Sequence, residues 1–597
     1  MKRVYVNEEV CIGCRLCEIH CVVQHSKSKK IIKVFKEEIR RPLARVLVEE
    51  KGPISFALQC RHCNDAPCIQ ACITGALYKN NGFVLHNKEK CIGCWTCIMT
   101  CPFGAIKRDE VAEKVASKCD LCFGEEVPVC VRKCPNEALV YENVPTGQEK
   151  SIPILNNPSV SLPGGETDQE NPISYVIIGN SVAAIGAIEA IRTNDQENPI
   201  TVVSDEPHHT YSRPLISMLL SGKVTEDRMY YRDADFYEKN KVTPILGKKA
   251  KSINVEDKVV ILEDDQKIPY DKLLIATGGK PFVPPMKGLD KYEILTFTKW
   301  DEVKKIKVMA KSAKRAVVVG GGFIGLKVAE SLNELGVKVV VVELLDRILG
   351  LVLDNIGSKI IHDRITEAGI EIVTENTIQE IVGSDSKITH VILKDGQKMD
   401  CDMVIVAIGV RSNIEIVENT PVEVNRGIVV NNKMETSVSD IYAAGDVAEA
   451  YDMLYESKRT TPILPSAYAQ GKIAGDNMSK GASEFPGDLP MNSIEFYGLP
   501  FMSIGIVNPE IAFPDDGFEA ITDTSNLKNN VYKKIILKDN RIIGAILIGA
   551  IDRAGIITGL IKDKVNVTPF KENLLDDEFG LISFPKELRK EKLRCVV

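Results

Sequence analysis

The sequence predicts a multidomain protein in which a cysteine-rich α+β module precedes two doubly wound α/β domains and a small α+β domain. The length supports several domains, because 597 residues exceed what one hydrophobic core organises and ordinary domain sizes suggest about four. The cysteines set the first module apart, since sixteen of the 18 lie between Cys11 and Cys134. From Ile173 onward, short β-branched runs alternate with helical segments, which is typical of doubly wound domains.

Composition narrows the class of protein. With 44% hydrophobic and 26% charged residues the chain falls among ordinary globular proteins, and no stretch reaches the roughly 18 apolar residues of a membrane span. The net charge of -7 argues against a general nucleic-acid binder, which needs an excess of Lys and Arg. The N-terminus lacks the apolar core and cleavage site of a signal peptide, so we expect a cytoplasmic protein. The sequence leaves open whether it is a monomer or a homo-oligomer.

Changes of composition place the expected domain boundaries. The cysteine module fills residues 1–148, and a stretch rich in Pro, Gly, Ser and Asn predicts a linker over 149–172. Two strand–glycine motifs and the later segment DIYAAGDVAEA suggest that the second α/β domain is inserted into the first. The expected order after the linker is the first part of one α/β domain (173–290), a second α/β domain (291–412), the remainder of the first (413–485) and an α+β domain (486–597).

The sixteen cysteines fall into four groups of four, each with three closely spaced thiols and a fourth a few residues later. Groups one and three have the C-x2-C-x2-C-x3-C spacing of bacterial ferredoxins, in which the fourth thiolate ligates the other cluster of a pair. The count therefore predicts four 4Fe-4S clusters. The groups are Cys11, Cys14, Cys17 and Cys21; Cys60, Cys63, Cys68 and Cys72; Cys91, Cys94, Cys97 and Cys101; and Cys119, Cys122, Cys130 and Cys134.

Details within the groups bear on this prediction. Cys101 and Cys134 precede Pro, which completes the ferredoxin signature, whereas Cys21 and Cys72 precede Val and Ile. Groups two and four carry extra residues before their third cysteine, and each still offers four ligands. Zinc sites and disulfides also use cysteine pairs, but repeated CxxCxxC triplets do not suit the paired knuckles of zinc ribbons.

Residues 1–145 resemble the electron-transfer iron-sulfur subunits that accompany carbon monoxide dehydrogenases, hydrogenases and molybdopterin reductases. The segments CIGCRLCEIHCVVQHSKSK, QCRHCNDAPCIQACITGAL and CIGCWTCIMTCPFGAI are most similar to the carbon monoxide dehydrogenase-associated type. The resemblance implies a duplicated ferredoxin-like domain that exchanges fourth ligands between groups one and four and between groups two and three. Because the cysteines already supply every ligand, His20, His25 and His62 are interpreted as packing or hydrogen-bonding residues.

The first nucleotide motif follows the strand YVIIG. Gly179, Ser181 and Ala184 form a GxGxxA pattern in which Ser replaces the second glycine, where the backbone must approach a pyrophosphate. The segment TVVSDE ends the next strand, so that Asp205 or Glu206 could bind the adenosine ribose hydroxyls. The segments ATGG and YAAGD further along the chain add support.

The second nucleotide motif is VVVGGGFIG. Gly320, Gly322 and Gly325 stand at GxGxxG spacing between a strand and a helix, whose first backbone amides can hold a pyrophosphate. The following strand ends at Glu343, where a carboxylate would bond the 2'-hydroxyl of NAD and repel the 2'-phosphate of NADP. We therefore expect NAD(H) as the nicotinamide nucleotide.

With these motifs in this order, residues 173–597 resemble the pyridine-nucleotide FAD oxidoreductases, and within them the NADH:rubredoxin oxidoreductase-like members. The segments SDEPHHTYSRPLIS and NSIEFYGLPFMSIGIV carry the closer likeness. The resemblance implies a flavin site whose Asp446 binds the flavin ribitol. Its other implied members are Thr277, Gly278 and Gly445, with Arg213 and Pro214 near the flavin.

Two departures from that family affect the chemistry. Disulfide reductases and NADH oxidases carry a redox cysteine after the first glycine motif, whereas HHTYSRPLISMLLSGKV has none, so thiol relay chemistry is not expected. Many relatives have Glu two residues past the last glycine of the second motif, where this chain has Lys327, a flavin-proximal candidate. Cys401 is interpreted as a core residue.

Together these parts predict an FAD-dependent iron-sulfur NAD(H) oxidoreductase. NADH gives up a hydride pair and iron-sulfur clusters accept single electrons, so a flavin is the converter between them. The expected route joins NAD(H), FAD, four clusters and an external protein, with carbon monoxide dehydrogenase as donor and net NAD+ reduction. A ferredoxin or hydrogenase would use the same route. The alternatives are an NADH-dependent reductase of polysulfide, peroxide or oxygen, and a non-enzymatic electron conduit or assembly subunit.

Overall fold

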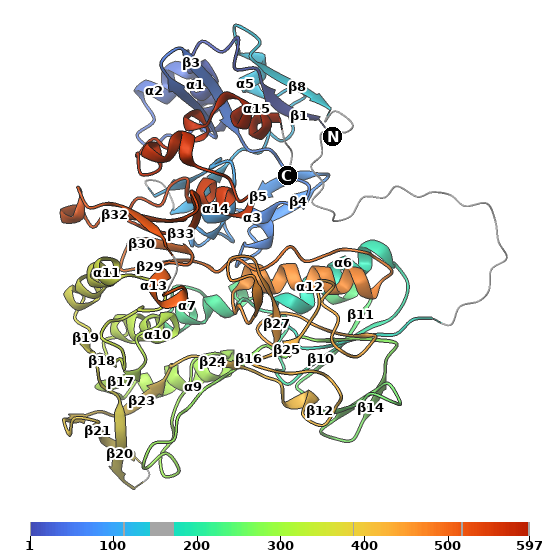
Figure 1. Cartoon of the computed structure of the whole chain (residues 1–597), viewed down its shortest axis with the longest axis vertical. Coiled ribbons are helices and arrows are strands. Elements are labelled where there is room, and N and C mark those ends of the chain that lie inside the picture. Colours follow the sequence, from blue (N-terminus) through green and yellow to red (C-terminus); the bar gives the residue numbers. More distant parts are fainter. Residues whose placement is uncertain (1, 111–113, 144–171, 386, 515–516, 595–597) are drawn as a thin grey trace, which may run out of the picture. The chain divides into compact units, whose positions relative to one another are not determined.

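The computed structural model forms two compact units, which are described separately here (Figure 1). Unit 1 combines residues 1–152 with 491–597, and unit 2 comprises residues 153–490. The α+β domain expected at the C-terminus therefore shares a unit with the cysteine module. The described residues are 2–110, 114–143, 172–385, 387–514 and 517–594, so the expected linker lies outside them except for its last residue. Among these residues, none of the helices has the length and apolar character that a bilayer crossing demands.

The cysteine module of unit 1 consists of four two-stranded antiparallel sheets and short helices that carry cysteines. Its first and last strands, β1 and β8, pair with each other and close the module. The residues that precede α1, α3 and α4 adopt left-handed backbone angles, which turn the chain sharply from a cysteine loop into each helix. The elements are β1 (Lys2–Val6), α1 (Leu16–His25), α2 (Ile31–Lys36), β2 (Val46–Lys51), β3 (Ile54–Gln59), α3 (Pro67–Gln70), β4 (Leu77–Asn80), β5 (Phe83–His86), α4 (Thr96–Thr100), β6 (Ile106–Asp109), β7 (Val115–Lys118), α5 (Val129–Arg132) and β8 (Leu139–Asn143).

The second part of unit 1 is a five-stranded antiparallel sheet in the order β29-β30-β33-β32-β31, followed by helices. Helix α14 packs against α4 of the cysteine module at Gly555, where an added Cβ would lie 2.5 Å from the carbonyl oxygen of Ile98. Only glycine permits so close an approach. The elements are β29 (Met491–Phe496), β30 (Leu499–Gly505), α13 (Pro509–Ala512), β31 (Glu519–Asp523), η4 (Leu527–Asn529), β32 (Tyr532–Lys538), β33 (Arg541–Ile548), α14 (Ala554–Lys562), η5 (Thr568–Asn573), η6 (Leu581–Ser583) and α15 (Lys586–Arg594).

The first α/β domain of unit 2 is built on a parallel sheet in the order β11-β10-β9-β15-β26. Strands β10, β9, β15 and β26 are largely buried and rich in Ile and Val, as strands covered on both faces require. Helix α6 packs closely on α12, because Gly471 lies against the backbone of Ala183. The elements before the second domain are β9 (Tyr175–Ile178), α6 (Val182–Asn194), β10 (Ile200–Ser204), η1 (Arg213–Leu215), α7 (Ile216–Leu220), η2 (Glu226–Arg228), α8 (Phe236–Lys239), β11 (Val242–Leu246), β12 (Ala250–Asn254), β13 (Val259–Leu262), β14 (Lys267–Pro269), β15 (Lys272–Ile275) and β16 (Gly279–Pro281).

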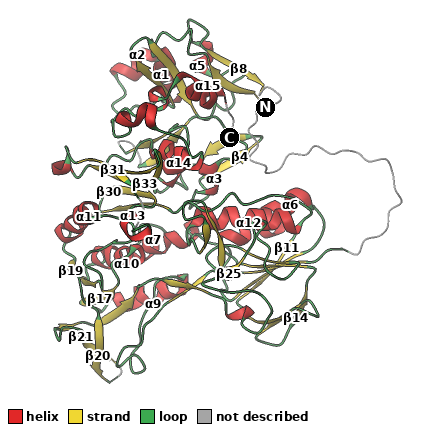
Figure 2. Cartoon of the chain, in the orientation of Figure 1, coloured by secondary structure: helices red, strands yellow, loops and turns green. Residues whose placement is uncertain are grey.

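The second α/β domain has its own parallel sheet, β19-β18-β17-β23. Strand β26 then returns to the first sheet and pairs with β15, so the second domain interrupts the first. Figure 2 distinguishes the helices from the strands by colour. The connecting strands β16 and β24 pair with each other where the chain leaves and re-enters the first domain. The elements of the second domain are α9 (Trp300–Ala310), β17 (Arg315–Val319), α10 (Phe323–Glu334), β18 (Lys338–Val342), α11 (Asn355–Glu367), β19 (Glu371–Val373), β20 (Ile378–Ser384), β21 (Lys387–Leu393), β22 (Lys398–Asp400), β23 (Met403–Val406) and β24 (Val410–Ser412). The first domain then continues with η3 (Glu415–Val417), β25 (Ile428–Val429), β26 (Ile441–Ala443), β27 (Ala448–Asp452), β28 (Ser457–Arg459) and α12 (Leu464–Met478).

Candidate functional site

Two cavities of unit 1 are lined by four cysteines each. Each cavity takes three cysteines from one sequence group and the fourth from another, which is the exchange that the resemblance implies. The first cavity also meets solvent, because Cys14 is exposed. The first set is Cys11, Cys14, Cys17 and Cys134, and the second set is Cys72, Cys91, Cys94 and Cys97.

The remaining eight cysteines interact electrostatically in two further sets. Burial and then the thiols of Cys60 and Cys101 raise the pKa of Cys63 to about 12. In the other set, burial and then the thiol of Cys21 raise the pKa of Cys122 to about 11. The third set is Cys60, Cys63, Cys68 and Cys101, and the fourth set is Cys21, Cys119, Cys122 and Cys130.

This arrangement suits iron-sulfur clusters. The first two sets surround cavities, as thiolates at the corners of a cubane would. Among the described residues, no three His, Cys, Asp or Glu side chains form a group suited to a single metal ion. The thiols that are packed together with raised pKa values would lose their protons when a cluster binds.

Backbone N–H groups point at several of the sulfur atoms. Arg45 donates to Cys21 Sγ at 3.2 Å, Ala138 to Cys134 Sγ at 3.2 Å, and Leu77 to Cys72 Sγ at 3.4 Å. Such donors stabilise negative charge on a cluster and tune its reduction potential.

The histidines near the cysteines act through hydrogen bonds. His25 Nδ1 lies 2.8 Å from the Cys21 carbonyl oxygen, and its Nε2 lies 3.1 Å from Asp120 Oδ1. Burial lowers the pKa of His25, but the hydrogen bonds to Asp120 and Cys21 together raise it to about 9. Burial instead lowers the pKa of His62, whose Nδ1 accepts a hydrogen bond from the Val84 amide at 3.0 Å. His20 is half-buried on α1.

The first glycine motif forms a tight turn from β9 into α6. Gly179 has φ +117°, and an added Cβ would overlap the carbonyl of Ala276. Ser181 is the N-cap residue of α6 without capping it through its side chain, and Ala184 is buried in the helix. The start of α6 therefore presents backbone amides at the end of the parallel sheet, as a pyrophosphate site requires.

The two carboxylates after β10 have different surroundings. Glu206 is buried, accepts a hydrogen bond from the Tyr211 hydroxyl at 2.6 Å and forms an ion pair with Arg213 at 2.5 Å. Asp205 is exposed and pairs with Lys299 at 2.6 Å. Both carboxylates have partners, but Asp205 is exposed and Glu206 is buried, so Asp205 is the more accessible ribose-binding candidate.

The other residues implied for the flavin site lie at the ends of neighbouring strands of the first sheet. The Thr277 hydroxyl donates to the Asn413 carbonyl at 2.7 Å, and Gly278 has φ +67° with open space where a Cβ would lie. Burial raises the pKa of Asp446, while the Arg213 guanidinium lowers it, so these two side chains interact. Pro214 follows Arg213 in η1. A buried carboxyl, a cation and an open glycine backbone fit a dinucleotide bound along this edge.

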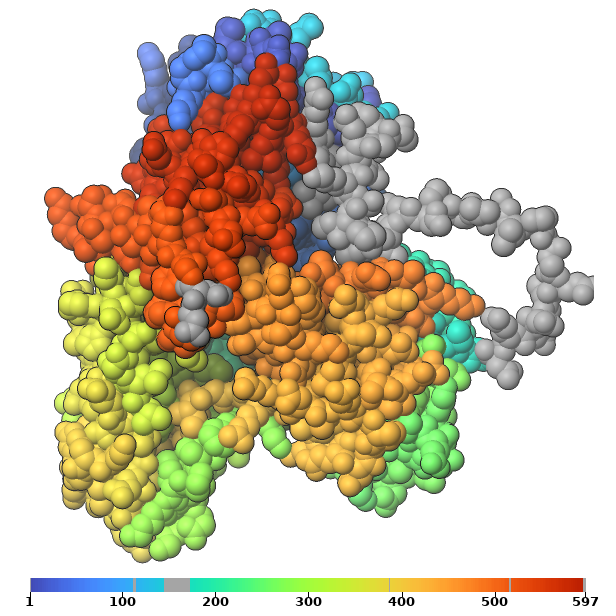
Figure 3. All heavy atoms as spheres, viewed as in Figure 1, coloured from blue at the N-terminus to red at the C-terminus, as the bar shows by residue number. Residues whose placement is uncertain are grey.

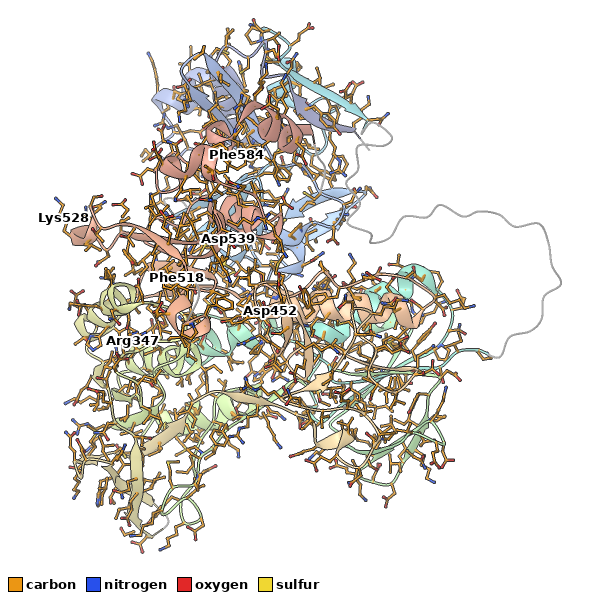
Figure 4. All side chains as sticks on the ribbon, viewed as in Figure 1. Arg347, Asp452, Phe518, Lys528, Asp539 and Phe584 are labelled. Carbon is orange, nitrogen blue, oxygen red and sulfur yellow. The ribbon has the colours of Figure 1, made fainter. Side chains whose placement is uncertain are left out.

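A hydrogen-bond network that the sequence did not predict holds the backbone next to Asp446. The Gly445 amide donates to Gln470 Oε1 at 2.8 Å, and Gln470 Nε2 donates to Asp488 Oδ2 at 2.9 Å. The backbone of Asp488 forms an isolated β-bridge with Asp452 on β27, which is labelled in Figure 4. Each of the two has a buried carboxyl oxygen without a hydrogen-bond partner among the described residues. Burial, and then the Asp452 charge, raise the pKa of Asp488 to about 7. No local sequence pattern signals these contacts.

The second glycine motif gives each glycine a separate role. Gly320 turns the chain with φ +109°, and Gly325 packs its helix so closely that an added Cβ would overlap the Gly320 carbonyl oxygen. Gly322 is different, because an added Cβ would meet nothing within 4 Å. The open side of Gly322 at the start of α10 is where a pyrophosphate fits. Glu343 reaches this loop and accepts a hydrogen bond from the Gly321 amide at 2.5 Å.

Lys327 lies on α10, where its ammonium pairs with the buried carboxylate of Glu330 one turn further. The same helix contacts the region after Arg213, because the Ser331 hydroxyl donates to the Ser217 carbonyl of α7 at 2.9 Å. Cys401 is buried in the core of the second domain.

Family models match three parts of the chain. The pyridine nucleotide-disulphide oxidoreductase model matches residues 173–471, a 4Fe-4S dicluster domain matches 54–144, and the rubredoxin NAD+ reductase C-terminal domain matches 490–565. The first model spans half of the chain. These matches cover the cysteine module, both nucleotide motifs and the C-terminal sheet.

Individual proteins are similar over much of their length. The epsilon subunit of NADH-dependent phenylglyoxylate dehydrogenase from Aromatoleum evansii is 30% identical over 67% of this chain and 94% of that protein. NADH-rubredoxin oxidoreductase from Clostridium acetobutylicum is 28% identical over 63% of this chain and 90% of that protein. Among solved structures, the NAD-dependent persulfide reductase from A. fulgidus has a TM-score of 0.62 at 26% identity, over 67% of this chain and 78% of that one.

Proposed function

The chain belongs to the pyridine nucleotide-disulphide oxidoreductase family, and from that premise we propose that it transfers electrons between NAD(H) and an external redox protein through FAD and four 4Fe-4S clusters. It is an NAD(H)-dependent flavin oxidoreductase with an iron-sulfur domain. The observation that carries the proposal is the pair of cavities that each gather four cysteines, in the same chain as two nucleotide-binding motifs. The sixteen cysteines, which form four groups of four in the sequence, support the count of four clusters.

The protein's own residues have binding and positioning roles in this proposal. Asp205 and Asp446 would hold the ribose and ribitol of FAD, and the amide at Gly322 would meet the pyrophosphate of NAD(H). Glu343 would accept the 2'-hydroxyl of NAD and repel the phosphate of NADP. Bound FAD supplies the exchange between a two-electron hydride and single electrons, and the cysteine sets hold the single-electron carriers.

The proposed donor is carbon monoxide dehydrogenase, with ferredoxin or hydrogenase as donors that would use the same route. The likeness of the three cysteine segments to subunits of that type supports it. A relative that is itself a subunit of an NADH-dependent dehydrogenase supports the wider idea of a partner enzyme. Oxidation of CO by water yields CO2, two protons and two electrons, and NAD+ takes up both electrons and one proton.

Mixing the anaerobically reconstituted protein with NAD+ and CO-reduced carbon monoxide dehydrogenase tests the proposal. We expect NADH absorbance to appear only when both proteins are present. Clusters that become reduced without NADH formation would place the failure between clusters and flavin. If no cluster is reduced, the dehydrogenase partnership is wrong, and the same assay with reduced ferredoxin or hydrogenase identifies the donor.

A second candidate function is the NADH-dependent reduction of a small substrate, which the similarity to a persulfide reductase favours. The segment HHTYSRPLISMLLSGKV offers no cysteine for thiol relay chemistry. Rapid NADH oxidation by polysulfide, peroxide or oxygen without any protein acceptor would favour this second function.

A further inference from the structure

A short segment of the cysteine module has a charge opposite to that of the whole chain. Residues 27–41, called the basic segment below, contain seven Lys and Arg and two Glu, whereas the protein has a net charge of -7. All seven cations are exposed. Within the described residues, no carboxylate forms an ion pair with Lys30, Lys33 or Lys36. This positive charge is therefore available to a partner.

Large apolar side chains are exposed among these cations. Ile32 is 66% exposed, Phe35 is 43% exposed and Ile39 is 99% exposed, while Val34 alone is fully buried and anchors α2. A segment that only needed to be soluble would not expose three such side chains within eight residues. Apolar side chains in a positively charged rim are typical of a surface that another protein covers. Helix α2 lies at the edge of unit 1, in the blue part of the surface (Figures 1 and 3).

Both ends of the basic segment are attached to the fourth cysteine set. The segment follows α1, which carries Cys21 and ends at His25, whose ring lies 3.7 Å from Cys21 Sγ. Beyond its other end, the Arg45 amide donates to the same sulfur at 3.2 Å. Arg45 and His25 also share Asp120, at 2.5 Å and 3.1 Å. A protein docked on this segment would thus lie beside a ligand of the fourth set.

We propose that the basic segment is the docking surface for an acidic electron-transfer protein that exchanges electrons with the cluster of the fourth set. This inference rests on the proposed function and adds the chemistry of the partner. Opposite charges would steer the acidic partner to the segment, and Ile32, Phe35 and Ile39 would be desolvated in the complex. For each NADH formed, the partner delivers two electrons, which leave with one proton on NAD+.

An anionic membrane surface is the main competing occupant of a basic apolar segment. Helix α2 has six residues and is only about 9 Å long. Ile32 and Phe35 of this helix are exposed, whereas Val34 is buried in the protein and could not enter a membrane. Membrane binding does not require that both ends of the segment contact Cys21. For a docked redox protein, these contacts shorten the distance that an electron travels to the fourth cysteine set.

Charge reversal tests the docking surface. The triple variant Lys30→Glu, Lys33→Glu, Lys36→Glu is compared with Lys307→Glu, Lys433→Glu, Lys528→Glu, which changes three exposed lysines elsewhere. The probe is an acidic two-cluster ferredoxin reduced photochemically, and NADH formation from NAD+ is followed at low and high salt. We expect the first variant to lower the second-order rate constant at least 10-fold at low salt and the control less than 2-fold. The difference should shrink at high salt, where charges are screened.

A second variant, Ile39→Ser, separates docking from folding because this side chain makes almost no contact with the protein. We expect it to weaken ferredoxin turnover at all salt concentrations while NADH-dependent ferricyanide reduction stays unchanged. Equal rates for the charge-reversal variant and its control would overturn the proposal. Salt-dependent binding of wild type to phosphatidylserine vesicles, with unaltered ferredoxin rates, would assign the segment to membranes. If wild-type protein forms no NADH with any reduced donor, the proposed function itself fails instead.

Discussion

The Glu343 carboxylate closes the second glycine loop by accepting hydrogen bonds from the amides of Gly321 and Leu345 at 2.5 Å and 2.8 Å. It is thereby fixed at the end of β18, beside the open backbone of Gly322. A fixed negative charge at this point discriminates against a 2'-phosphate by repulsion and favours a hydroxyl donor.

Replacing Glu343 by Ala should therefore weaken NADH binding and reduce the preference for NADH over NADPH. Loss of a charged hydrogen bond corresponds to about 10-fold or more in KM. Steady-state ferricyanide reduction with each nucleotide measures the change, and Glu371→Ala, at an exposed position on β19, is the control. An unchanged NADH to NADPH ratio would show that Glu343 does not contact the nucleotide.

The buried pair Asp488 and Asp452 makes stability depend on pH. The folded-state pKa of Asp488 is about 7, above its ordinary value of 3.8, so folding favours the protonated acid. The stabilisation is complete below pH 3.8 and is lost as pH rises toward 7. We expect Asp488→Asn, which keeps the hydrogen bond to Gln470 in reach, to raise the unfolding temperature at pH 8 more than at pH 5.

Thermal unfolding of the FAD-loaded protein, followed by flavin fluorescence, measures this difference. Asp264→Asn, at an exposed carboxylate, is the control and should show no such pH trend. A shift of equal size at both pH values would contradict a raised pKa at Asp488.

At the residue scale, the spacing of motifs predicts candidate cluster ligands, but it does not predict the residues that hold the nucleotide loops in place. The cysteine groups and their exchanged fourth members could be proposed from motif and resemblance, because cluster geometry constrains the spacing. Gln470 and Asp488 could not, because they reach Gly445 from distant parts of the chain and follow no motif. The partners of Glu206 could not be predicted either, because only the structure shows its ion pair with Arg213 and its hydrogen bond from Tyr211.

The element proposed to position NAD(H) is the β17–α10 turn, in which two glycines have opposite requirements. Gly325 allows the helix to touch the turn, whereas Gly322 leaves room for a ligand. Gly322 has φ -84°, so alanine fits its backbone without strain.

We expect Gly325→Ala to lower the thermal stability of the second domain, with a cost of about 1–3 kcal/mol for overpacking. Gly322→Ala should leave stability unchanged and raise the Kd for NADH at least 10-fold, because its methyl group occupies the pyrophosphate space. Calorimetry of unfolding and of NADH binding distinguishes the two variants. Equal loss of stability in both would contradict these separate roles.

Element positions were largely predictable because hydrophobic runs and glycine motifs are local signals. Strands β16 (279–281) and β24 (410–412) connect the two α/β domains, while the boundaries expected at 290 and 412 stay predictions. Strand β16 is short and half-exposed, so its composition resembles a loop. Its pairing with β24 is a contact between distant residues, which no local pattern shows.

At the scale of the molecule, the C-terminal domain and the cysteine module belong to one unit. Buried ion pairs join them, including Arg553 with Glu49 at 2.7 Å and Arg589 with Glu8 at 2.6 Å. The Ser493 hydroxyl also donates to the carbonyl of Cys94 at 2.8 Å. The C-terminal domain thus supports two of the cysteine loops.

Separating these parts should impair cluster assembly. Gly555→Val would push α14 away from the Cys101 loop and should lower the iron content per chain while FAD content stays unchanged. Iron and flavin analysis of the reconstituted protein measures both, and Gly517→Ala, where an added Cβ meets nothing within 4 Å, is the control. Full iron content in Gly555→Val would show that this contact does not support the clusters.

This association was the least predictable feature. The contacts join residues several hundred positions apart. The local sequence patterns of the cysteine module and of the C-terminal domain each predict an independent domain. Sequence patterns therefore predict two separate domains, whereas the structure places both in one compact unit.

The central claim, that clusters and nicotinamide exchange electrons in this chain, is tested most directly by single-turnover NADH formation. The reconstituted protein is reduced photochemically without dithionite, mixed anaerobically with excess NAD+, and followed by cluster absorbance, electron paramagnetic resonance and NADH yield. Six stored electrons, two on FAD and four on clusters, predict about three NADH per chain together with loss of the reduced-cluster signal. About one NADH per chain, with clusters that remain reduced, would contradict the account.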